Sequence, residues 1–551
     1  MLAPRALPFD LREWREKPFR IRLEWLCKAW VTQGFGAPPG VYLFYLFKIL
    51  LFIIVWLVAC IHFHHLGSLS DFSVWCYDLR TLKLLIVWAI LFELLGFGCG
   101  SGPLTGRYMP PITAFMHFLR PGTIKSPLYP FLPFFGGDTR RVWEVLLYGL
   151  ILGFLGKILF VSSIKEYDIL IIVGLILLLT LSDKTVYLAA RSEHYLIALI
   201  CIYFSGDAIS GLKLTWIAIW FWAATSKLNR HFPYVISVMV SNHPLIFSKA
   251  FKKRMFKDFP KDLRPSQLSG LLAHFGTITE YTFPVLLLLG EGGMLTLIGL
   301  SLMLLFHFFI TSSIPMGVPL EWNVVMVFGA FVLFGQYADV SVFDIDTYLL
   351  YLVLIVSLVV FPLLGNIYPK HFSFLVSMRY YAGNWAHSIW LFKKGAEDKL
   401  DKKIKKSASI IPKQLSPFYD ELTCYALLSK VAVFRALHLH GRIAHRLLKY
   451  MVDDMEQYEW RDGENVAGVV LGWNFGEGHI HDEQLLRAMQ KRCAFLPGEL
   501  RCLMVESQPM FKSYQKWRIY DAHDGLMLAS KTKIDSLLDR QPWPQKDPFS
   551  I

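Results

Sequence analysis

Ten apolar runs between residues 41 and 366 constrain the fold of this chain more than any other feature of its sequence. A helix needs about 20 predominantly apolar residues to cross a bilayer, and most of the runs approach that length. Some runs are shorter, so we expect about eight to ten spans in a polytopic α-helical membrane protein. The runs cover residues 41–63, 81–99, 142–162, 168–182, 193–206, 212–227, 271–290, 294–313, 321–338 and 347–366.

Composition and charge divide the chain into four segments. The whole chain is 54% hydrophobic and 18% charged, whereas soluble domains are about 45–50% apolar and about 25% charged. The displacement comes from the first three quarters of the chain, because residues 393–551 have an ordinary soluble composition. We expect an interfacial N-terminal segment (1–40), a transmembrane helical module (41–366), a basic juxtamembrane linker (367–413) and a small soluble α+β domain (414–551).

The N-terminal segment has the pattern of a helix that lies on a membrane surface. Its apolar residues alternate with arginine and lysine, and they are Phe19, Ile21, Leu23, Leu26 and Trp30. A simple cap on the first span explains the pattern equally well. The segment lacks the apolar stretch of a cleavable signal peptide.

Basic residues predict the orientation of the membrane module. Residues 249–264 carry seven basic and two acidic side chains, and residues 393–413 carry eight lysines and three acids. Residues 337–346 carry only acids. Because positively charged segments stay on the cytoplasmic side, we expect both termini in the cytoplasm. The basic segments either only fix this orientation or also contact anionic headgroups.

Lys227 is the leading candidate for a functional residue. It follows the aromatic run that contains Trp222, and it lies near the end of the apolar run 212–227. An ionisable group at membrane depth is costly, so it marks a functional site when it faces the helix bundle. The alternative is a terminal lysine whose amine extends to the membrane surface. An inward-facing, desolvated amine has a lowered pKa and can act as a base.

Other ionisable residues recur in the neighbouring runs, and together they predict a polar pocket among the helices. Each one alone is more simply explained as a hydrogen-bonded packing residue. His274, Thr277 and Tyr281 have the spacing of a shared helix face, as do His307 and Thr311. The candidate residues are Glu193, His194, Asp207, His274, Glu280 and His307.

Residues 96–137 are rich in glycine, proline and aromatic residues, so they cannot form one regular helix. An apolar irregular segment must be buried in protein or lie at the membrane interface, because lipid cannot satisfy its backbone. We interpret it as an interfacial or re-entrant loop over a lipid-access cavity. A plain cytoplasmic connector is the alternative.

The soluble region has a mixed α and β pattern. Residues 422–459 have helical periodicity, with Arg435 and Arg442 on the outer face. Residues 465–476 have the pattern of a buried strand, and a helix is expected to begin at His481 or Asp482. Further strands follow, including a hairpin that turns at Asp524-Gly525.

No metal, disulfide or nucleotide site is predicted. The eight cysteines include no C-x-x-C pair. His438 and His440 would lie about 200° apart on a helix, which is unsuited to chelation. A cluster of metal-ligand types, Glu477 to Asp482, is explained equally well by helix capping. The segment "GWNFGEG" lacks the pattern of a phosphate-binding loop.

The membrane module resembles the HTTM superfamily, the fold of vitamin K-dependent gamma-glutamyl carboxylase. The resemblance covers about residues 140–366 and is carried by Glu193-His194-Tyr195, by Asp207 and by the Ala-x-x-Lys-Leu segment that contains Lys227. The segment "TEYTFPVLLLLG" with Glu280, and the segment around His307, are similar to later helices of that fold.

The resemblance implies a role for two residues. In the carboxylase, the lysine at the Ala-x-x-Lys position deprotonates a reduced quinone, which nominates Lys227 as a base and His194 as its supporting partner. Two departures limit the transfer. Glu193 stands where the carboxylase has asparagine, and the large extracytoplasmic domain that holds protein substrates has no counterpart. Carboxylation of glutamate is therefore not implied.

Over its whole length the chain resembles an uncharacterised bacterial family of transmembrane proteins, most clearly in residues 466–486 and 506–522. We expect a protein that handles a lipid or quinone-like molecule, with Lys227 as the base if it is an enzyme. The alternative is a non-catalytic lipid transporter, or a scaffold that recruits a cytoplasmic protein through the C-terminal domain. The expected partners are membrane lipids and not nucleic acid.

Overall fold

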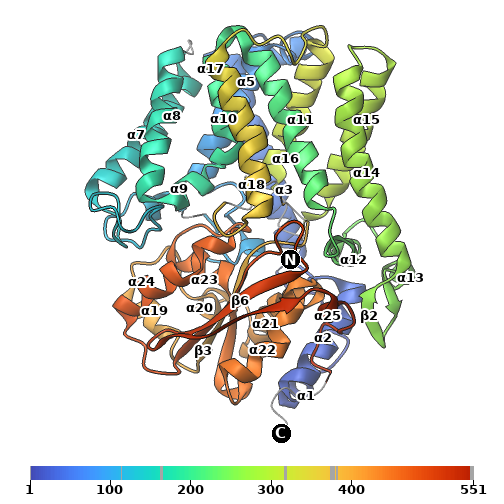
Figure 1. Cartoon of the computed structure of the whole chain (residues 1–551), viewed down its shortest axis with the longest axis vertical. Helices are drawn as coiled ribbons and strands as arrows, with labels where there is room; N and C mark the ends of the chain where they lie inside the picture. Colours follow the sequence, from blue (N-terminus) through green and yellow to red (C-terminus); the bar gives the residue numbers. More distant parts are fainter. Residues whose placement is uncertain are drawn as a thin grey trace.

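A computed structural model describes residues 2–112, 114–161, 165–314, 319–372, 379 and 382–545. The chain forms an upper layer of long helices and a lower layer built around a β-sheet (Figure 1). The lower layer contains the C-terminal part of the chain together with its first helices. The prediction of a polytopic helical membrane protein with a small C-terminal sheet region is confirmed.

Each of the ten apolar runs forms a helix of the upper layer. Six helical stretches are long and apolar enough to cross a membrane: Pro39–Phe63, Val142–Phe160, Ser205–Ser226, Gln267–Leu289, Met294–Ser312 and Tyr348–Ile367. The other runs form shorter helices in the same layer (Figure 1). The helices are α3 (Pro39–Val58, continued by η1 Ala59–Phe63), α5 (Leu79–Leu94), α7 (Val142–Phe160), α8 (Glu166–Ser182), α10 (Ser192–Tyr203), α11 (Ala208–Ser226), α14 (Gln267–Leu289), α15 (Met294–Ser312), α16 (Leu320–Ala330, continued by η6 Phe331–Gln336) and α17 (Tyr348–Ile355, continued by η7 Val356–Val360 and α18 Phe361–Ile367).

Helix α5 forms the centre of the upper layer. Nearly all of its side chains are buried, and it packs against α3, α7, α10 and α16. A helix that is apolar all round is stable only when it is surrounded by other helices or by lipid. The outer helices expose large apolar side chains, including Phe47, Leu146, Leu271 and Phe308. An exposed apolar surface of this extent is suited to lipid contact.

The lower layer is built on a five-stranded antiparallel sheet in the order β4-β3-β5-β6-β7. Alternate side chains of the internal strand β3 point to opposite faces, and both faces are covered. Ile389 and Leu391 lie in one core with α22, whereas Trp390 and Phe392 lie in another core with α23 and α24. The elements are β3 (His387–Lys393), β4 (Tyr458–Asp462), β5 (Leu500–Val505), β6 (Tyr514–Asp521), β7 (Gly525–Lys533), α19 (Asp398–Lys403), α20 (Ile411–Leu415), α21 (Glu421–Leu437), α22 (Ile443–Met451), α23 (Gly463–Val470), α24 (Glu483–Cys493) and α25 (Asp535–Leu538).

Two sequence predictions for the lower layer are confirmed. The β6–β7 hairpin turns at Asp524-Gly525, with Asp521 paired to Gly525, whose φ of 84° suits glycine. Helix α24 begins after Asp482, whose carboxylate accepts the backbone N–H of Gln484 at 2.9 Å.

The strand predicted at residues 465–476 is wrong, because that segment begins with helix α23. A short apolar run fits a buried strand and a buried helix equally well. Here a helix N-cap at Asp462 favours the helix. The Asp462 carboxylate accepts the backbone N–H of Glu464 at 2.9 Å and starts the helix. The strand of this region is β4, which ends at the same aspartate.

The helical periodicity predicted over 422–459 is present, but it does not form one helix. It breaks after Leu437, and the two halves α21 and α22 meet at 110°. Gly441 allows the break, because a Cβ there would lie 1.9 Å from the carbonyl oxygen of Arg435. Arg435 and Arg442, expected on the outer face, are both buried. Arg435 is held by the Asp462 carboxylate, and Arg442 lies 4.6 Å from the Tyr234 ring.

The N-terminal helices α1 (Leu11–Glu16) and α2 (Phe19–Gln33) belong to the lower layer (Figure 1). Leu23, Leu26 and Trp30 are buried against α12 (Phe232–Asn242) and α21. Protein therefore covers the apolar side that the sequence assigned to a membrane surface.

Residues 96–112 and 114–141 connect the two layers. Their backbone is irregular, as predicted, apart from the short η3 (Pro103–Thr105) and α6 (Ala114–Phe118). The segment contacts the C-terminal domain: Gln414 Oε1 accepts the N–H of Tyr108 at 2.9 Å, and Arg107 donates to the Gly468 carbonyl at 2.9 Å. These contacts agree with a connector between layers rather than a loop that faces lipid.

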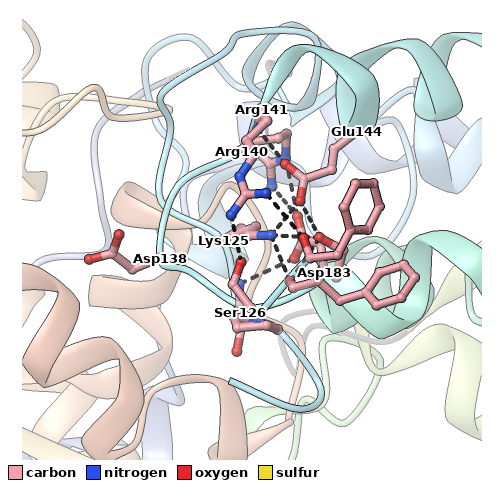
Figure 2. A network of polar contacts seen from close by, with 12 residues as sticks. Lys125, Ser126, Asp138, Arg140, Arg141, Glu144 and Asp183 are labelled. Carbon is pink, nitrogen blue, oxygen red and sulfur yellow. Dashed lines mark hydrogen bonds and ion pairs between the residues drawn. The ribbon is translucent and has the colours of Figure 1, made fainter. Parts of the chain in front are cut away.

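A buried ionic network holds the far end of this connector (Figure 2). Lys125 pairs with Glu144 at the start of α7, and Arg140 pairs with Asp183 at the end of α8. The side chains of both pairs are at most 1% exposed. Asp138 lies apart from the network and binds Arg492 of α24 at 3.1 Å. The two buried pairs therefore hold the connector against α7 and α8. Asp138, at the edge of the network, binds the C-terminal domain through Arg492.

His479 gives the lower layer a predicted pH dependence. It lies in η10 (Gly478–Ile480) between Glu477 at 2.7 Å and Glu506 at 3.0 Å. Burial lowers the pKa of His479, but Glu506 and Glu477 together raise it to about 10. Since the unfolded value is about 6.5, this stabilisation is complete below pH 6.5 and is lost as the pH rises through about 10.

His479→Gln is therefore expected to flatten the decline of Tm between pH 6.5 and about 10. The measurement is thermal unfolding of the purified protein at a series of pH values in this range. His523→Gln is the matched control, because His523 is half exposed and pairs with the exposed Asp524. An unchanged profile in His479→Gln would contradict the assignment.

Candidate functional site at the base of the helical layer

Lys227 points into the protein. It is the residue that ends α11, its side chain is 6% exposed, and its ammonium forms an ion pair with Glu280 of α14. The rings of Phe232 and Phe306 lie 5.5 and 5.3 Å from the amine. The amine is thus enclosed by a carboxylate and aromatic rings instead of extending to the membrane surface. This pair unites two of the residues nominated from the sequence.

His307 lies on the same side of the bundle and uses both ring nitrogens. Trp220 Nε1 donates to His307 Nε2 at 3.0 Å, so this nitrogen is the acceptor. The proton therefore resides on Nδ1, which donates to Asn323 Oδ1 at 2.7 Å. His307 is a neutral imidazole that joins α11, α15 and α16, and it has no nitrogen left for a ligand.

A second polar cluster, unrecognised in the sequence, surrounds Arg191 just before α10. Arg191 Nε donates to Glu93 Oε1 at 2.9 Å, and its Nη2 contacts Cys99 Sγ. Lys48 of α3 donates to the Gly98 carbonyl at 2.7 Å beside the same group. Glu93 is the single acidic residue of the apolar run 81–99. An acid at membrane depth is the sequence signal that could have identified Glu93 as a candidate site residue.

Glu321 completes this cluster. It is 2% exposed, and its Oε1 has no hydrogen-bond partner among the residues that the structure describes. Glu93, Cys99 and Glu321 form the one group among the described residues whose ligand atoms lie close enough to hold a metal ion, within 4.8 Å of one another. The Arg191 guanidinium already occupies the position between Glu93 and Cys99. The cluster is therefore better suited to a balanced set of buried charges than to a metal.

Glu193 and His194 follow Arg191 in the first turn of α10. Both are buried, and the His194 ring lies 5.8 Å from the Trp322 ring. The first turn of α16, Glu321-Trp322-Asn323, thus reaches three groups: the Arg191 cluster, His194 and His307. This turn connects the residues nominated on α10 with those on α15.

The remaining three nominated residues lie elsewhere. Trp222 Nε1 donates to the Leu358 carbonyl at 2.6 Å and holds α11 against η7. Asp207 accepts the backbone N–H groups of residues 346 and 347 at the opposite end of α11, about 30 Å from Lys227 at 1.5 Å per residue. His274 is exposed on the outer side of α14, whereas Thr277 is buried. These positions do not support a single pocket that contains all the nominated residues.

A groove opens beside Glu193 between α8, α10 and the α17–η7 helix. Its volume is about 350 Å³. It follows α10 from Ser192 to Ile200, about 12 Å at the helical rise, and its walls are mainly apolar side chains such as Leu196 and Val356. Glu193 supplies the ionisable group of the lining. Lys227, Glu280 and His307 are not among the residues that line it.

The loop after α23 covers the Arg191 cluster from the C-terminal domain. The Phe475 ring lies 4.8 Å from the Arg191 guanidinium. Asn474 donates to the Thr105 carbonyl at 2.8 Å, and the Trp473 ring packs so closely on Gly100 that a Cβ there would lie 2.8 Å from it. The "GWNFGEG" segment is therefore a lid on the base of the helical layer.

A family model described as "Transmembrane protein of unknown function (DUF3556)" matches residues 1–551, so the chain belongs to this family. The predicted membership of an uncharacterised transmembrane family is thereby confirmed. No curated protein and no solved structure matches the chain. The resemblance to the HTTM superfamily rests on the sequence segments alone.

Proposed function

We propose that this member of a transmembrane family binds an apolar molecule with one polar end, a lipid or a quinone-like isoprenoid, in the groove beside α10. The observation that carries the proposal is the groove itself: an apolar channel in the helical layer with a buried carboxylate, Glu193, at one end. Ligand sites are mostly apolar concavities with a few polar groups that fix orientation. The acyl or isoprenoid chain would lie along α10, and its hydroxyl or amine would meet Glu193.

A catalytic role of Lys227 is a finer proposal that depends on its neighbour. An amine acts as a base only when it is neutral, and the Lys227 amine forms an ion pair with Glu280. For Lys227 to remove a proton from a ligand, Glu280 must first accept the proton of the ammonium. We therefore propose the Lys227–Glu280 pair, and not the lysine alone, as an acid–base unit, separate from the groove because neither residue lines it.

The orientation proposed from charge agrees with the placement of the basic segments. Residues 249–264 and 393–413 lie at the end of the molecule that carries the C-terminal domain (Figure 1). Positive segments remain on the cytoplasmic side. We therefore propose a bacterial inner-membrane protein whose termini and C-terminal domain face the cytoplasm.

Filling the groove tests the proposed function. Ile200→Trp places a large side chain in the groove, and Leu170→Trp places the same side chain on the exposed surface of α8 outside it. Native mass spectrometry of the purified protein is expected to detect a copurified lipid or isoprenoid in the wild type and in Leu170→Trp, with at least a tenfold loss in Ile200→Trp. Equal lipid content in all three proteins would reject the groove as a binding site.

A non-catalytic scaffold is the second candidate, and one observation favours it. The edge strand β7 exposes Leu526, Met527 and Leu528, which is unusual for a solvent-facing strand. Such an edge suits a cytoplasmic protein partner. For a scaffold, substitutions on β7 would remove function, whereas substitutions in the groove would not.

A further inference from the structure

We infer that a basic pocket on the C-terminal domain binds a soluble organic phosphate, with the phosphate group between Arg446 and Arg540 and the organic part against Tyr450. The pocket lies between helix α22, strands β6 and β7 and the chain that follows α25, and its volume is about 740 Å³. Ligand pockets in proteins have volumes of about 300–1,000 Å³. The pocket shares no lining residue with the groove beside α10, so the inference is independent of the proposed function.

Two arginines of the lining converge on one residue of helix α25. Arg446 Nη1 donates to the Ser536 hydroxyl at 3.0 Å, and Arg540 Nε donates to the Ser536 carbonyl at 3.1 Å. The two guanidinium groups are neighbours of like charge, and both burial and Arg446 lower the pKa of Arg540. Both side chains are partly exposed, so their remaining N–H donors are accessible to a ligand.

No carboxylate pairs with either of these arginines in the part of the chain that the structure describes. The described lining contains no aspartate or glutamate. Asp535 of helix α25 pairs with Arg230, which is outside the pocket. Asp539, just after the helix, pairs with Arg264. Clustered cations without a counter-ion favour an anionic ligand, and the planar fork of arginine matches the oxygens of a phosphate.

Helix α22 presents a cation and an aromatic ring beside Arg446. Lys449 and Tyr450 follow Arg446 by three and four positions, so the three side chains share the outer face of the helix. Lys449 is exposed, and its amine lies 5.2 Å from the ring of Tyr450, which is 50% exposed. Side chains four positions apart are separated by about 5–6 Å at Cβ. A phosphate on Arg446 and a ring against Tyr450 can therefore belong to one small molecule.

The other groups of the lining do not oppose an anion. Arg442 is 1% exposed and donates to the carbonyl oxygens of residues 263 and 540. Burial lowers the pKa of His445 to about 4, so its ring is neutral near pH 7. The Lys531 amine lies 5.0 Å from the Tyr514 ring. The remaining polar side chains of the lining are uncharged at this pH and belong to Tyr450, Trp517, Thr532, Gln541, Trp543 and Gln545.

The position of the pocket favours a soluble ligand over a lipid headgroup. Helix α22 lies on the side of the lower layer that is away from the long helices (Figure 1). The expected ligand therefore reaches the pocket from solution.

The test is isothermal titration calorimetry of the full chain in phosphatidylcholine nanodiscs, with phenyl phosphate, inorganic phosphate and phenol as probes. We expect phenyl phosphate to bind at least tenfold more tightly than either of the others. Arg446→Gln and Arg540→Gln are each expected to weaken its binding about tenfold, because each removes a charge-assisted hydrogen bond. Arg487→Gln is the matched control, because Arg487 is exposed on α24 outside the pocket, and its affinity is expected to equal that of the wild type.

Two further measurements separate the parts of the inference. Tyr450→Ala changes an exposed residue, and it is expected to weaken binding of phenyl phosphate but not of inorganic phosphate. Nanodiscs that contain phosphatidic acid are expected to leave the affinity for phenyl phosphate unchanged. A tenfold loss in these nanodiscs would show that a lipid headgroup occupies the pocket, which would overturn the soluble source.

The groove variant distinguishes this inference from the proposed function. Ile200→Trp is expected to retain the affinity for phenyl phosphate, whereas Arg446→Gln is expected to retain the copurified lipid. Thermal unfolding establishes that each variant is folded. The inference would be overturned if phenyl phosphate did not bind the wild type, or if it bound equally well to the double variant Arg446→Gln with Arg540→Gln.

Discussion

Glu280→Leu is expected to lower the free energy of unfolding by about 3–5 kcal/mol, because it leaves the Lys227 ammonium buried without a counter-charge. The pair is at most 6% exposed, so water cannot replace the lost carboxylate. The measurement is reversible denaturation in lipid bicelles, monitored by tryptophan fluorescence. Trp220 and Trp222 lie in the same helix as Lys227 and report on its environment.

The double variant Lys227→Met with Glu280→Leu is the matched control. It removes both charges and fills their place with apolar side chains, so its stability is expected to lie within about 2 kcal/mol of the wild type. If the pair is an acid–base unit, this folded protein retains its lipid and loses its activity. A double variant as unstable as the single one would show that the pair stabilises the fold by something other than charge compensation.

Asp183→Leu is expected to have an effect of similar size through the network of Figure 2. It leaves the Arg140 guanidinium buried and unpaired, which costs about 3–5 kcal/mol. It also removes the cap of α9 (Lys184–Ala189), where the Asp183 carboxylate accepts the N–H of Thr185 at 3.1 Å, a loss of about 1 kcal/mol. Denaturation in bicelles measures the loss of stability, and limited proteolysis measures the release of the C-terminal domain.

Asp138→Asn provides the control for this network. Asp138 is 30% exposed at the edge of the network and pairs with Arg492. A partly exposed ion pair contributes about 0–1 kcal/mol, so this variant is expected to remain near wild-type stability. Equal losses in Asp183→Leu and Asp138→Asn would contradict the assignment of the stabilisation to the buried pair.

The sequence predicted where the helices of the upper layer lie, because length and apolar composition are properties of a single segment. Among the described residues, six stretches are long and apolar enough to cross a membrane, fewer than the eight to ten spans expected. Every apolar run became a helix. The secondary structure and burial of the lower layer were predicted less completely from the sequence. The run at 465–476 fits a buried strand or a buried helix, and the Asp462 cap decides between them. Arg435 and Arg442 were placed on the outer face because charge usually marks the surface, but their buried partners belong to other elements.

The candidate site was predicted in part. The sequence nominated Lys227, Glu280 and His307, and the structure brings the first two into contact. It also nominated Asp207, which lies at the other end of α11. The sequence did not predict the Arg191–Glu93 pair, because the two residues are 98 positions apart in the chain. Helix periodicity relates residues three or four positions apart, and it carries no information about such pairs.

Phe475 has a consequence for how the chain can be divided. One face of its ring lies against Arg191 in the helical layer. Phe475 lies in the C-terminal part of the chain, so severing the chain in the linker would separate its ring from Arg191 and expose the Arg191 charges to water. Complementation by two separately expressed fragments therefore requires that the Phe475 ring of one fragment packs again on Arg191 of the other.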